Sequence, residues 1–455
     1  MLYRKAYDKL LEWKKDPHRK ALCIIGAHQV GKTTVVRQFG NKEYALFVEI
    51  NFITQPDAVR IFDGSLDAKT LITKLTAYTQ SKMLPGKTLV FLDEVQACPN
   101  ARTAIKFLVE DGSFDYIEAY SIPYEKHKEP GSLPVGFEKI DYMYPMDLEE
   151  FLWANGVPKT TVQYLKNCYE SKTPVLDSIH ATMCKLFYSY NVVGGMPDVV
   201  QTYVDTHDIA KVISRQSEIL ELYRQDIAQY AQGNDKQKIK AIFDNIPSQL
   251  NDKNRRFILN TVSANARQIR YSDSFNWLSD AGVALPCYNV EAPQPSLRLN
   301  EKHSLFKLFM GDTGLLCAAS TENVQFGILN GDLQINMGSI LENLIAQQLK
   351  ANGFFLNYFD SKRYGEIDFV IQNGMSIELI EAKSGNDYKK HSALTKVMGI
   401  EEWKFQKATV LCKGNIETVN GVHYLPWYMI MFMNSYQPPK EMKYEVDLSA
   451  LNDIS

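Results

Sequence analysis

A glycine-rich segment between an apolar strand and a helix constrains the fold of this chain more than any other feature. Residues 26–33 read Gly-Ala-His-Gln-Val-Gly-Lys-Thr and match the pattern G-x-x-x-x-G-K-[ST]. Such glycines let the backbone N–H groups point at phosphate oxygens, while Lys32 places a cation on the β- and γ-phosphates and Thr33 offers magnesium a hydroxyl ligand. A predicted strand over Ala21–Ile25 and an amphipathic helix over Thr34–Phe39 flank the segment. Because a glycine turn without a ligand reads similarly, the motif needs a second element.

Two carboxylates at the end of another apolar strand provide that element. Leu89–Leu92 is followed directly by Asp93 and Glu94. Asp93 would hold magnesium through water and Glu94 would polarise the attacking water, whereas a solvated strand end is the alternative. The two motifs in this order predict a site for ATP and Mg²⁺. The residues expected to contact the nucleotide are Gly26, Ala27, His28, Gln29, Val30, Gly31, Lys32, Thr33 and Thr34.

Composition bounds the remaining possibilities. The 455 residues suffice for two to four domains, and a net charge of −3 excludes a polycation, so any nucleic-acid contact must come from local patches. Seven scattered cysteines without zinc-finger spacing predict reduced thiols. The longest apolar run, Leu425–Met433, is shorter than the roughly 20 residues that span a bilayer. With no secretory signal at the N-terminus, we expect a cytoplasmic protein that does not enter a membrane.

Periodicity divides the chain into five regions. Short apolar runs between helices over residues 1–150 predict a parallel sheet covered on both faces, and helical periodicity over residues 151–235 predicts a lid. Residues 236–330 have the outline of a winged helix-turn-helix. Residues 331–435 predict a separate mixed α/β domain, and residues 436–455 a tail. The elements expected in the winged helix are helices over Lys236–Leu250, Asn254–Ala264 and Ser272–Ala281, and hairpin strands over Val283–Val290 and Leu305–Phe309.

The nucleotide motifs also carry a family resemblance. The segments IIGAHQVGKTTVVRQF and LVFLDEVQ resemble those of bacterial and archaeal AAA-type ATPases that have a winged helix and a C-terminal restriction-endonuclease-like domain of unknown function. Four further segments resemble that family in the same order: Tyr144–Phe151, Val193–Pro197, Phe306–Phe309 and Asp312–Leu316. The resemblance implies an α/β fold class, comprising a P-loop NTPase core, a helical lid, a winged helix-turn-helix and a C-terminal restriction-endonuclease-like α/β domain. It also implies ATP hydrolysis and a homo-oligomer.

Two positions depart from the family pattern. The family commonly has arginine at the position of His28, and Gly-Ser where this chain reads Tyr120-Ser121. The resemblance makes Ser121 a catalytic residue that senses the γ-phosphate or the nucleophilic water, while Tyr120 changes the local geometry. Arg224 is the candidate for an arginine finger, with a solvated helix charge as the alternative.

Two neighbouring strands predicted near the C-terminus carry a second group of chemically active residues. Because side chains alternate along a strand, Glu381 and Lys383 project to one side together. Pairing of the strands would bring Asp368 beside Glu381, so that both carboxylates hold magnesium and Lys383 orients or deprotonates a water against a phosphodiester. Glu342, on the preceding helix, would add another metal ligand. The pattern is the D…(D/E)-x-K of restriction-endonuclease-like nucleases, and the alternatives are an Asp368–Lys383 ion pair or a degenerate nuclease fold kept for binding.

Basic residues concentrate in the expected winged helix. Such a patch would neutralise phosphates, and the expected recognition helix offers only Asn276 for base reading, which favours backbone contacts. A solvated basic face, or a winged helix used for protein contacts, is the alternative. The basic residues are Lys236, Lys238, Lys240, Lys253, Arg255, Arg256, Arg267 and Arg270.

These features lead to one leading hypothesis and two rivals. The leading hypothesis is an ATP-driven protein that binds or processes nucleic acid, with DNA favoured over RNA. The first rival is a nucleotide-dependent regulatory switch whose nuclease-like domain does not cleave. The second is a small signalling ATPase that meets no nucleic acid, for which added DNA or RNA would leave the ATPase rate unchanged.

Overall fold

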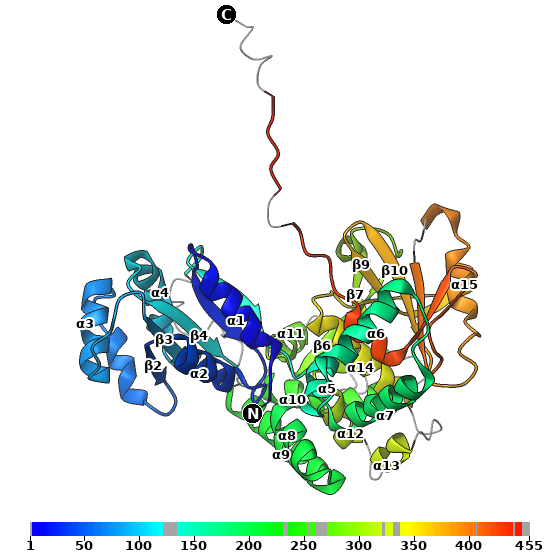
Figure 1. Cartoon of the computed structure of the whole chain (residues 1–455), viewed down its shortest axis with the longest axis horizontal. Helices are drawn as coiled ribbons and strands as arrows, with labels where there is room; N and C mark the ends of the chain where they lie inside the picture. Colours follow the sequence, from blue (N-terminus) through cyan, green and yellow to red (C-terminus); the bar gives the residue numbers. More distant parts are fainter. Residues whose placement is uncertain are drawn as a thin grey trace, which may run out of the picture.

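The chain folds into two lobes joined by a layer of helices (Figure 1). This computed structural model describes residues 2–121, 134–230, 235–252, 255–259, 271–320, 324–330, 337–403, 405, 407–439 and 442–447. The first lobe contains the N-terminal α/β region, and the second contains the C-terminal sheet (Figure 1). In these segments, none of the helices has both the length and the apolar character needed to cross a lipid bilayer.

The first lobe is built on a five-stranded sheet in the order β2-β3-β4-β1-β5, in which every neighbouring pair is parallel. The inner strands β1 and β3 are buried along their whole length because helices cover both faces, as a parallel sheet requires. The strands are β1 (Ala21–Ile25), β2 (Leu46–Asn51), β3 (Thr88–Asp93), β4 (Asp115–Tyr120) and β5 (Glu138–Tyr142).

Two pairs of helices cover this sheet. Helices α1 (Lys5–Lys15) and α2 (Lys32–Glu43) share one hydrophobic core with the first face, whereas α3 (Ala68–Thr79) and α4 (Pro99–Asp111) share another with the second face. Short 3₁₀ helices span η1 (Pro56–Phe62) and η2 (Val95–Ala97). Since all the strands run the same way, the loops after β1, β3 and β4 meet at one edge of the sheet. This edge carries both predicted nucleotide motifs.

A helical layer follows the first sheet, as the periodicity predicted. Its helices are α5 (Leu148–Ala154), α6 (Lys159–Ser171), α7 (Asp177–Val193), α8 (Pro197–Thr206), α9 (Ile209–Tyr230) and α10 (Asp235–Asn251). Helices α11 (Ser272–Asp280) and α12 (Thr313–Ser320) complete it, and α12 packs against both α7 and α9.

The region expected to be a winged helix differs from its outline in one helix. The expected first and third helices correspond to α10 and α11, and the hairpin consists of β6 (Ala284–Val290) and β7 (Glu301–Met310), which pair antiparallel. The expected middle helix is wrong over residues 255–258, which are not helical; residues 254 and 260–264 lie outside the described segments. Arg255 has a φ of 47°, in the left-handed region that interrupts an α-helix.

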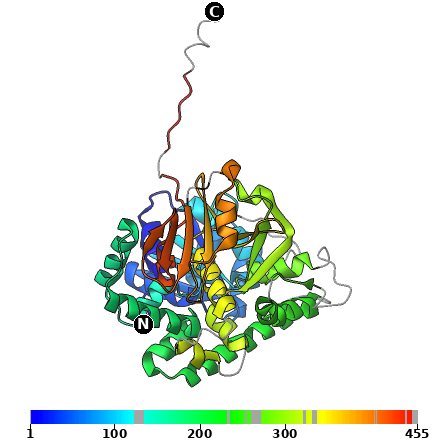
Figure 2. The same ribbon diagram turned by 90° about the vertical axis from the view of Figure 1, so that its right-hand side faces the viewer.

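The hairpin also does not stand apart from the C-terminal region. Its strand β6 pairs in parallel with β8 (Asn357–Ser361), so that β6 and β7 extend an eight-stranded sheet in the order β12-β13-β11-β10-β9-β8-β6-β7. Figure 2 shows this sheet facing the viewer, with the yellow-green hairpin beside the orange and red strands. The expectation of a separate C-terminal domain is therefore wrong at this boundary. Pairing with β8 satisfies backbone groups that a free hairpin edge would leave exposed.

The remaining elements belong to the second lobe. Expected strands over residues 366–371, 376–383 and 408–412 correspond to β9, β10 and β11, and the expected helix over residues 339–351 to α14. The strands are β9 (Gly365–Asn373), β10 (Ser376–Ala382), β11 (Lys407–Cys412), β12 (Glu417–Val419) and β13 (Val422–Pro426). The helices are α13 (Val324–Leu329), α14 (Met337–Ala351), α15 (Ser392–Met398), η5 (Leu297–Asn300), η6 (Glu401–Trp403) and η7 (Trp427–Phe432). Residues 436–439 and 442–447 of the expected tail contain no helix or strand.

Two tight turns lock the helical layer to both lobes. The backbone N–H of Met146 donates to Gly195 O at 2.6 Å, and a Cβ atom at Gly195 would overlap Met146 O, so only glycine fits this approach. The N–H of Gly195 donates in turn to the buried Asp312 carboxylate at 2.6 Å, which also accepts from Leu315 N at 3.0 Å. Burial raises the pKa of Asp312 to about 6, which these hydrogen bonds oppose.

Candidate functional sites

The glycine-rich loop has the curled backbone that its spacing predicted. Gly31 has a φ of 92° and Gln29 a φ of 65°, so both lie in the left-handed region. At Gly26, a Cβ atom would overlap Met143 O on the segment after β5, which leaves no room for a side chain. Helix α2 begins at Lys32, directly after the loop, so its positive end faces the same space. The loop is therefore a cradle of the shape that phosphate binding needs.

Lys32 lies inside this cradle. Its Nζ donates to Gly26 O at 2.8 Å and to Ala27 O at 2.9 Å, and its side chain is buried. Burial lowers the pKa of Lys32 to about 8, and the nearby carboxylates Glu94 and Asp93 partly offset that effect. Two carbonyl oxygens thus hold the ammonium group at the place where a phosphate would bind.

The predicted magnesium ligands meet across the sheet edge. Thr33 Oγ1 donates to Asp93 Oδ2 at 2.9 Å, and burial raises the pKa of Asp93. Asn51 Nδ2 donates to the same oxygen at 2.9 Å. Sequence reasoning missed Asn51, although β2 and β3 pair with Asn51 opposite Asp93. The feature that could have indicated Asn51 is its position: it is a polar residue at the end of an apolar strand, and the neighbouring strand ends in Asp93.

Glu94 and Ser121 also converge, as predicted for residues that act on water and γ-phosphate. Ser121 Oγ donates to Glu94 Oε1 at 3.4 Å, and Gln96 Nε2 donates to Glu94 Oε2 at 2.6 Å. Glu94 has a φ of 54°, which turns the chain sharply after β3. Tyr120 contacts the guanidinium of Arg102 through its ring instead, with 5.1 Å from the ring centre to Cζ.

A cavity of 580 Å³ lies beside the loop, and residues of the helical layer form its opposite wall. Pro197, Asp198 and Gln201 of α8 line it opposite the loop, as do Leu222 and Asp226 of α9. From the loop and the sheet edge it receives His28, Gln29, Gly31, Lys32, Thr33, Thr34, Glu94 and Ser121. A volume of this size falls within the range of small-molecule sites.

His28 connects the loop to α9. Its Nδ1 lies 2.8 Å from Asp226 Oδ2, and its backbone oxygen accepts from Tyr223 OH at 3.1 Å. Sequence reasoning missed this contact, because the partners are almost 200 residues apart. Arg224, the candidate arginine finger, instead pairs with Asp244 at 2.9 Å and does not line the cavity.

Arg4 is a further residue that sequence reasoning missed. It is buried and donates three hydrogen bonds: to Val30 O at 2.6 Å, to Tyr144 O at 2.8 Å and to Glu150 Oε1 at 3.1 Å. One guanidinium therefore fixes the loop to the segment that follows β5. An arginine directly before a charged first helix carries no sequence signal for such a role.

The four residues predicted for the C-terminal site line one cavity of 380 Å³. Asp368 lies on β9, Glu381 at the end of β10, Lys383 just beyond it, and Glu342 on α14. Asp368 Oδ2 accepts from Ala382 N at 2.8 Å, and Lys383 Nζ donates to Glu381 Oε1 at 2.7 Å. The prediction that strand pairing places Asp368 beside Glu381 agrees with this geometry.

The carboxylates of this cavity differ in their surroundings: one has an oxygen without a partner, and another is paired with cations of the protein. Burial, and then Asp368, raise the pKa of Glu381 to about 7, and its Oε2 has no hydrogen-bond partner. Glu342 instead pairs with Arg255 and with the fully buried Lys307, at 3.2 Å from the latter. The ligand oxygens of Glu342, Asp368 and Glu381 do not all lie within 4.8 Å of one another, so in the described residues the three do not form a ready three-carboxylate site. Asp368 and Glu381 remain a candidate pair.

The predicted basic patch is dispersed. Lys236, Lys238 and Lys240 lie on α10, and Asn276 is exposed on α11. Arg255 pairs with Glu342, and Arg256 pairs with Asp360 beside the C-terminal cavity. Lys253, Arg267 and Arg270 lie outside the described residues.

Comparison with protein families agrees with the geometry of the first lobe. Residues 18–152 match the family model described as an AAA domain, which agrees with the phosphate-loop geometry of this lobe. Residues 184–325 match a domain of unknown function (DUF8612), and residues 337–430 match another (DUF4143). Each of these models covers less than half of the chain. No curated protein matches it.

Solved structures resemble the chain only distantly. A Walker-type ATPase of Pyrococcus abyssi is 11% identical, with 70% of this chain and 96% of that chain covered and a TM-score of 0.41. The ORC1 protein of Aeropyrum pernix in complex with DNA is 12% identical, with 72% and 94% covered and a TM-score of 0.31. The RuvB Holliday junction branch migration motor of Thermotoga maritima is 13% identical, with 62% and 89% covered and a TM-score of 0.30. Likeness at this level supports no inference about function.

Proposed function

We propose that the first lobe binds ATP with magnesium and hydrolyses it. The observation that carries the proposal is the contact of Thr33 Oγ1 with Asp93 Oδ2 at 2.9 Å, directly beside the buried ammonium group of Lys32. A hydroxyl and a carboxylate next to a cradle without room for a Cβ atom are the donors that a magnesium triphosphate needs. The residues of this edge therefore fit both the nucleotide and the metal.

Each side chain has a separate task in this proposal. Lys32 would exchange its two carbonyl partners for phosphate oxygens, which carry full negative charge. Bound magnesium would neutralise charge that develops on the phosphates. Glu94, held by Ser121 and Gln96, would orient the attacking water as a general base. The contact between His28 and Asp226 would let α9 respond to a filled loop.

Hydrolysis by matched lysine variants tests this proposal. Lys32→Ala should abolish ATP binding and turnover, because the charge beside the phosphates is lost. Lys42→Ala is the control, since Lys42 lies on the same helix α2 but contacts the ring of Tyr7. If both variants hydrolyse ATP at the rate of the unmodified chain, the proposed site is wrong.

We infer that the ATPase acts as a homo-oligomer. Arg4 is the one arginine among the described residues that line the nucleotide cavity, and its guanidinium already donates to three protein oxygens. A positive charge for the transition state would then come from a neighbouring copy. The specific ATPase rate should rise with protein concentration, in parallel with the mass measured by sedimentation. If the protein sediments as a monomer and its ATPase rate per chain does not vary with protein concentration, this arrangement is excluded.

For the second lobe, we propose that the cavity around Asp368, Glu381 and Lys383 binds nucleic acid and cleaves it with a bound metal. The free Oε2 of Glu381 beside Asp368 supports a metal between the two carboxylates. Duplex, branched and single-stranded DNA and RNA would be incubated with magnesium or manganese. Cleavage should disappear on Asp368→Ala combined with Lys383→Ala and persist in Lys390→Ala, which changes a lysine of the rim that pairs with Asp387.

One observation favours the rival function, a nucleotide-dependent switch without cleavage. Lys307 and Arg255 both pair with Glu342, so the third expected metal ligand is already neutralised by protein cations. The switch predicts an ATPase rate that changes on adding DNA, with no cleavage of any substrate. Cleavage that requires Asp368 would exclude it, and a flat ATPase rate with no cleavage would favour a signalling ATPase instead.

A further inference from the structure

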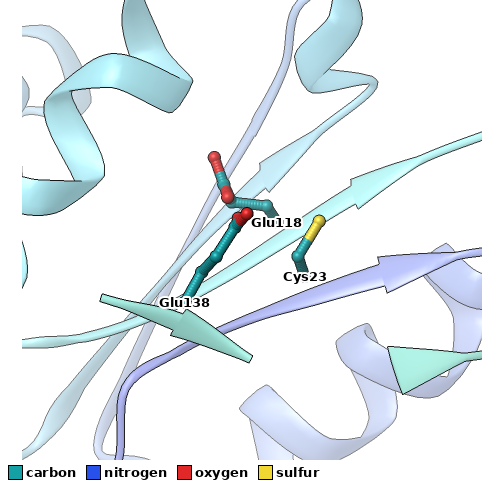
Figure 3. Close-up of side chains that lie close together, drawn as sticks. All are labelled: Cys23, Glu118 and Glu138. Atoms are coloured by element: carbon teal, nitrogen blue, oxygen red, sulfur yellow. The ribbon is translucent and has the colours of Figure 1, made fainter. Parts of the chain in front are cut away.

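Three side chains from neighbouring strands of the first lobe converge inside the sheet (Figure 3). Cys23 lies on β1, Glu118 on β4 and Glu138 on β5, and β1 runs between the other two. The register sets Cys23 opposite Glu118 and Ala21 opposite Glu138. The thiol sulfur and one oxygen of each carboxyl group lie within 4.8 Å of one another. Within the described segments, no other trio of His, Cys, Asp or Glu residues meets so closely.

The cluster is buried and poorly satisfied. Cys23 and Glu118 are 0% exposed, and the carboxyl oxygens of Glu118 meet no hydrogen-bond partner other than the carboxyl group of Glu138. Glu138 accepts from Arg102 Nη2 at 2.8 Å through Oε1, which leaves its Oε2 without a partner. Burying a carboxyl group whose only polar neighbour is a second acid costs roughly several kcal/mol, so its retention on a central strand favours a ligand. Figure 3 shows the carboxyl groups of Glu118 and Glu138 turned toward each other, with the sulfur of Cys23 on the same side.

The charges of the cluster suit a divalent cation. Burial, followed by the charge of Glu138, raises the pKa of Glu118 well above its usual range, and burial does the same for the Cys23 thiol. Without a ligand, burial therefore favours the protonated form of both groups, and Arg102 pairs with Glu138. With a divalent cation, a thiolate and two carboxylates carry three negative charges, which the cation and Arg102 balance. One metal ion thus replaces two protons without changing the net charge of the core.

We propose that Cys23, Glu118 and Glu138 bind one zinc ion. A thiolate excludes magnesium and calcium, which take oxygen ligands, whereas zinc accepts sulfur and oxygen together. Zinc lies about 2.0–2.3 Å from its ligand atoms. The sulfur and the two carboxyl oxygens would therefore have to approach one another by about one bond length or less. The second oxygen of Glu118 is free to take a fourth position. Arg102 is the outer partner that fixes the ligating carboxylate of Glu138, as metal sites commonly have.

The position of the cluster indicates what the ion would do. The edge strand β5 pairs with β1 alone within the sheet, and a metal would tie it to β4 as well. Cys23 lies three positions before Gly26, the first residue of the phosphate loop, and Glu118 lies three positions before Ser121. The zinc would therefore stiffen the sheet directly beneath the nucleotide site and take no part in the chemistry there.

Cobalt substitution of the full chain tests the site. Cobalt bound to a cysteine thiolate has a charge-transfer absorption that cobalt bound to oxygen lacks, so the Thr33–Asp93 site stays silent. We expect one zinc per chain in the protein as isolated, and one thiolate–cobalt equivalent after exchange. The band should persist in Cys98→Ser, which changes another buried cysteine of the same lobe, and vanish in Cys23→Ser. Glu118→Gln should weaken zinc binding at least tenfold.

The unmodified chain gives a second measurement in case the variants fail to fold. Chelation should lower the Tm of the first lobe, and added zinc should restore it, because a ligand that binds only the folded state stabilises it. Absence of both stoichiometric zinc and the cobalt band, or a band that survives in Cys23→Ser, would overturn the proposal. A Tm that is indifferent to chelation in a zinc-containing protein would also overturn it.

Discussion

Replacement of Arg4 by methionine should destabilise the first lobe and weaken ATP binding together. The change keeps much of the apolar stem but removes donors to Val30 O, Tyr144 O and the Glu150 carboxylate. Breaking a buried ion pair costs about 3–5 kcal/mol. Glu150 keeps two backbone donors, at 2.6 Å and 3.1 Å, so we place the loss near about 3 kcal/mol. For a lobe of this size, that lowers the Tm by roughly 6–12 °C.

The same contacts give the expected effect on the nucleotide. Val30 belongs to the phosphate loop, and a hydrogen bond from a charged donor contributes about 1.5–3 kcal/mol. If the variant loses the lower of these values, about 1.5 kcal/mol, from the free energy of ATP binding, the Kd for ATP rises about tenfold. Burial raises the pKa of Glu150 and Arg4 opposes that rise, so Glu150→Gln should recover part of the stability lost in Arg4→Met.

Thermal unfolding and calorimetric ATP titration measure both effects. Arg60→Met is the matched control, because Arg60 is exposed and pairs only with Asp57 at 3.5 Å. Its Tm and Kd should stay at those of the unmodified chain. If Arg4→Met matches this control in both measurements, Arg4 does not fix the loop and the reasoning from its three hydrogen bonds fails.

Three further predictions concern the contacts that join the lobes. Gly195→Ala should cost about 3 kcal/mol because its Cβ atom would overlap a carbonyl oxygen, whereas Gly385→Ala, with open space around it, should change thermal stability by under about 0.5 kcal/mol. Lys307→Met should cost about 3 kcal/mol in urea unfolding, the low end for breaking a buried ion pair, because Arg255 still pairs with Glu342; Glu342→Gln should recover part of this, and full stability of Lys307→Met would refute the buried pair. The pKa of Asp312 is raised to about 6, so its carboxyl group contributes stability below pH 4 that is lost as pH rises through about 6. Relative to Asp312→Asn, stability should fall by about 3 kcal/mol between pH 4 and pH 7, and a difference that does not vary with pH would contradict the assignment.

The nucleotide site could be predicted because its determinants are local. A loop of eight residues fixes the positions of Lys32 and Thr33, and the parallel sheet brings the end of β3 to the same edge. Strand alternation was likewise enough to place Asp368 beside Glu381, since the two strands are joined by a short turn. Short-range rules determine such contacts almost completely.

Contacts between distant segments could not be predicted in this way. Arg4 and Glu150 are 146 positions apart, and nothing in either neighbourhood indicates the other. Residues 255–258 were expected to be helical from their composition, but Arg255 and Arg256 extend toward acids of the second lobe instead. The hairpin of β6 and β7 was recognised, while its pairing with β8 depends on an edge that only the folded second lobe provides. In each of these cases, contacts between residues far apart in the sequence determined the structure, and the local sequence does not indicate such contacts.

A continuous series of polar contacts connects the nucleotide cavity with the C-terminal cavity. Arg4 joins the phosphate loop to Glu150 of α5, and the N–H of Leu148 at the start of that helix donates to Gln348 Oε1 of α14 at 3.1 Å. Helix α14 also carries Glu342, which lines the C-terminal cavity. A shift of the loop on nucleotide binding would therefore act on α5 and α14 through hydrogen bonds that tolerate little displacement.

A second series of contacts starts on the opposite side of the same loop. His28 pairs with Asp226 of α9, α9 packs on α12, and Asp312 just before α12 accepts from Gln347 of α14 at 3.4 Å. Both series end on neighbouring residues of one helix. This convergence makes α14 the element through which ATP binding would reach the second lobe. If the second lobe responded to nucleotide while α14 did not move, the coupling would have to pass through contacts other than these two series.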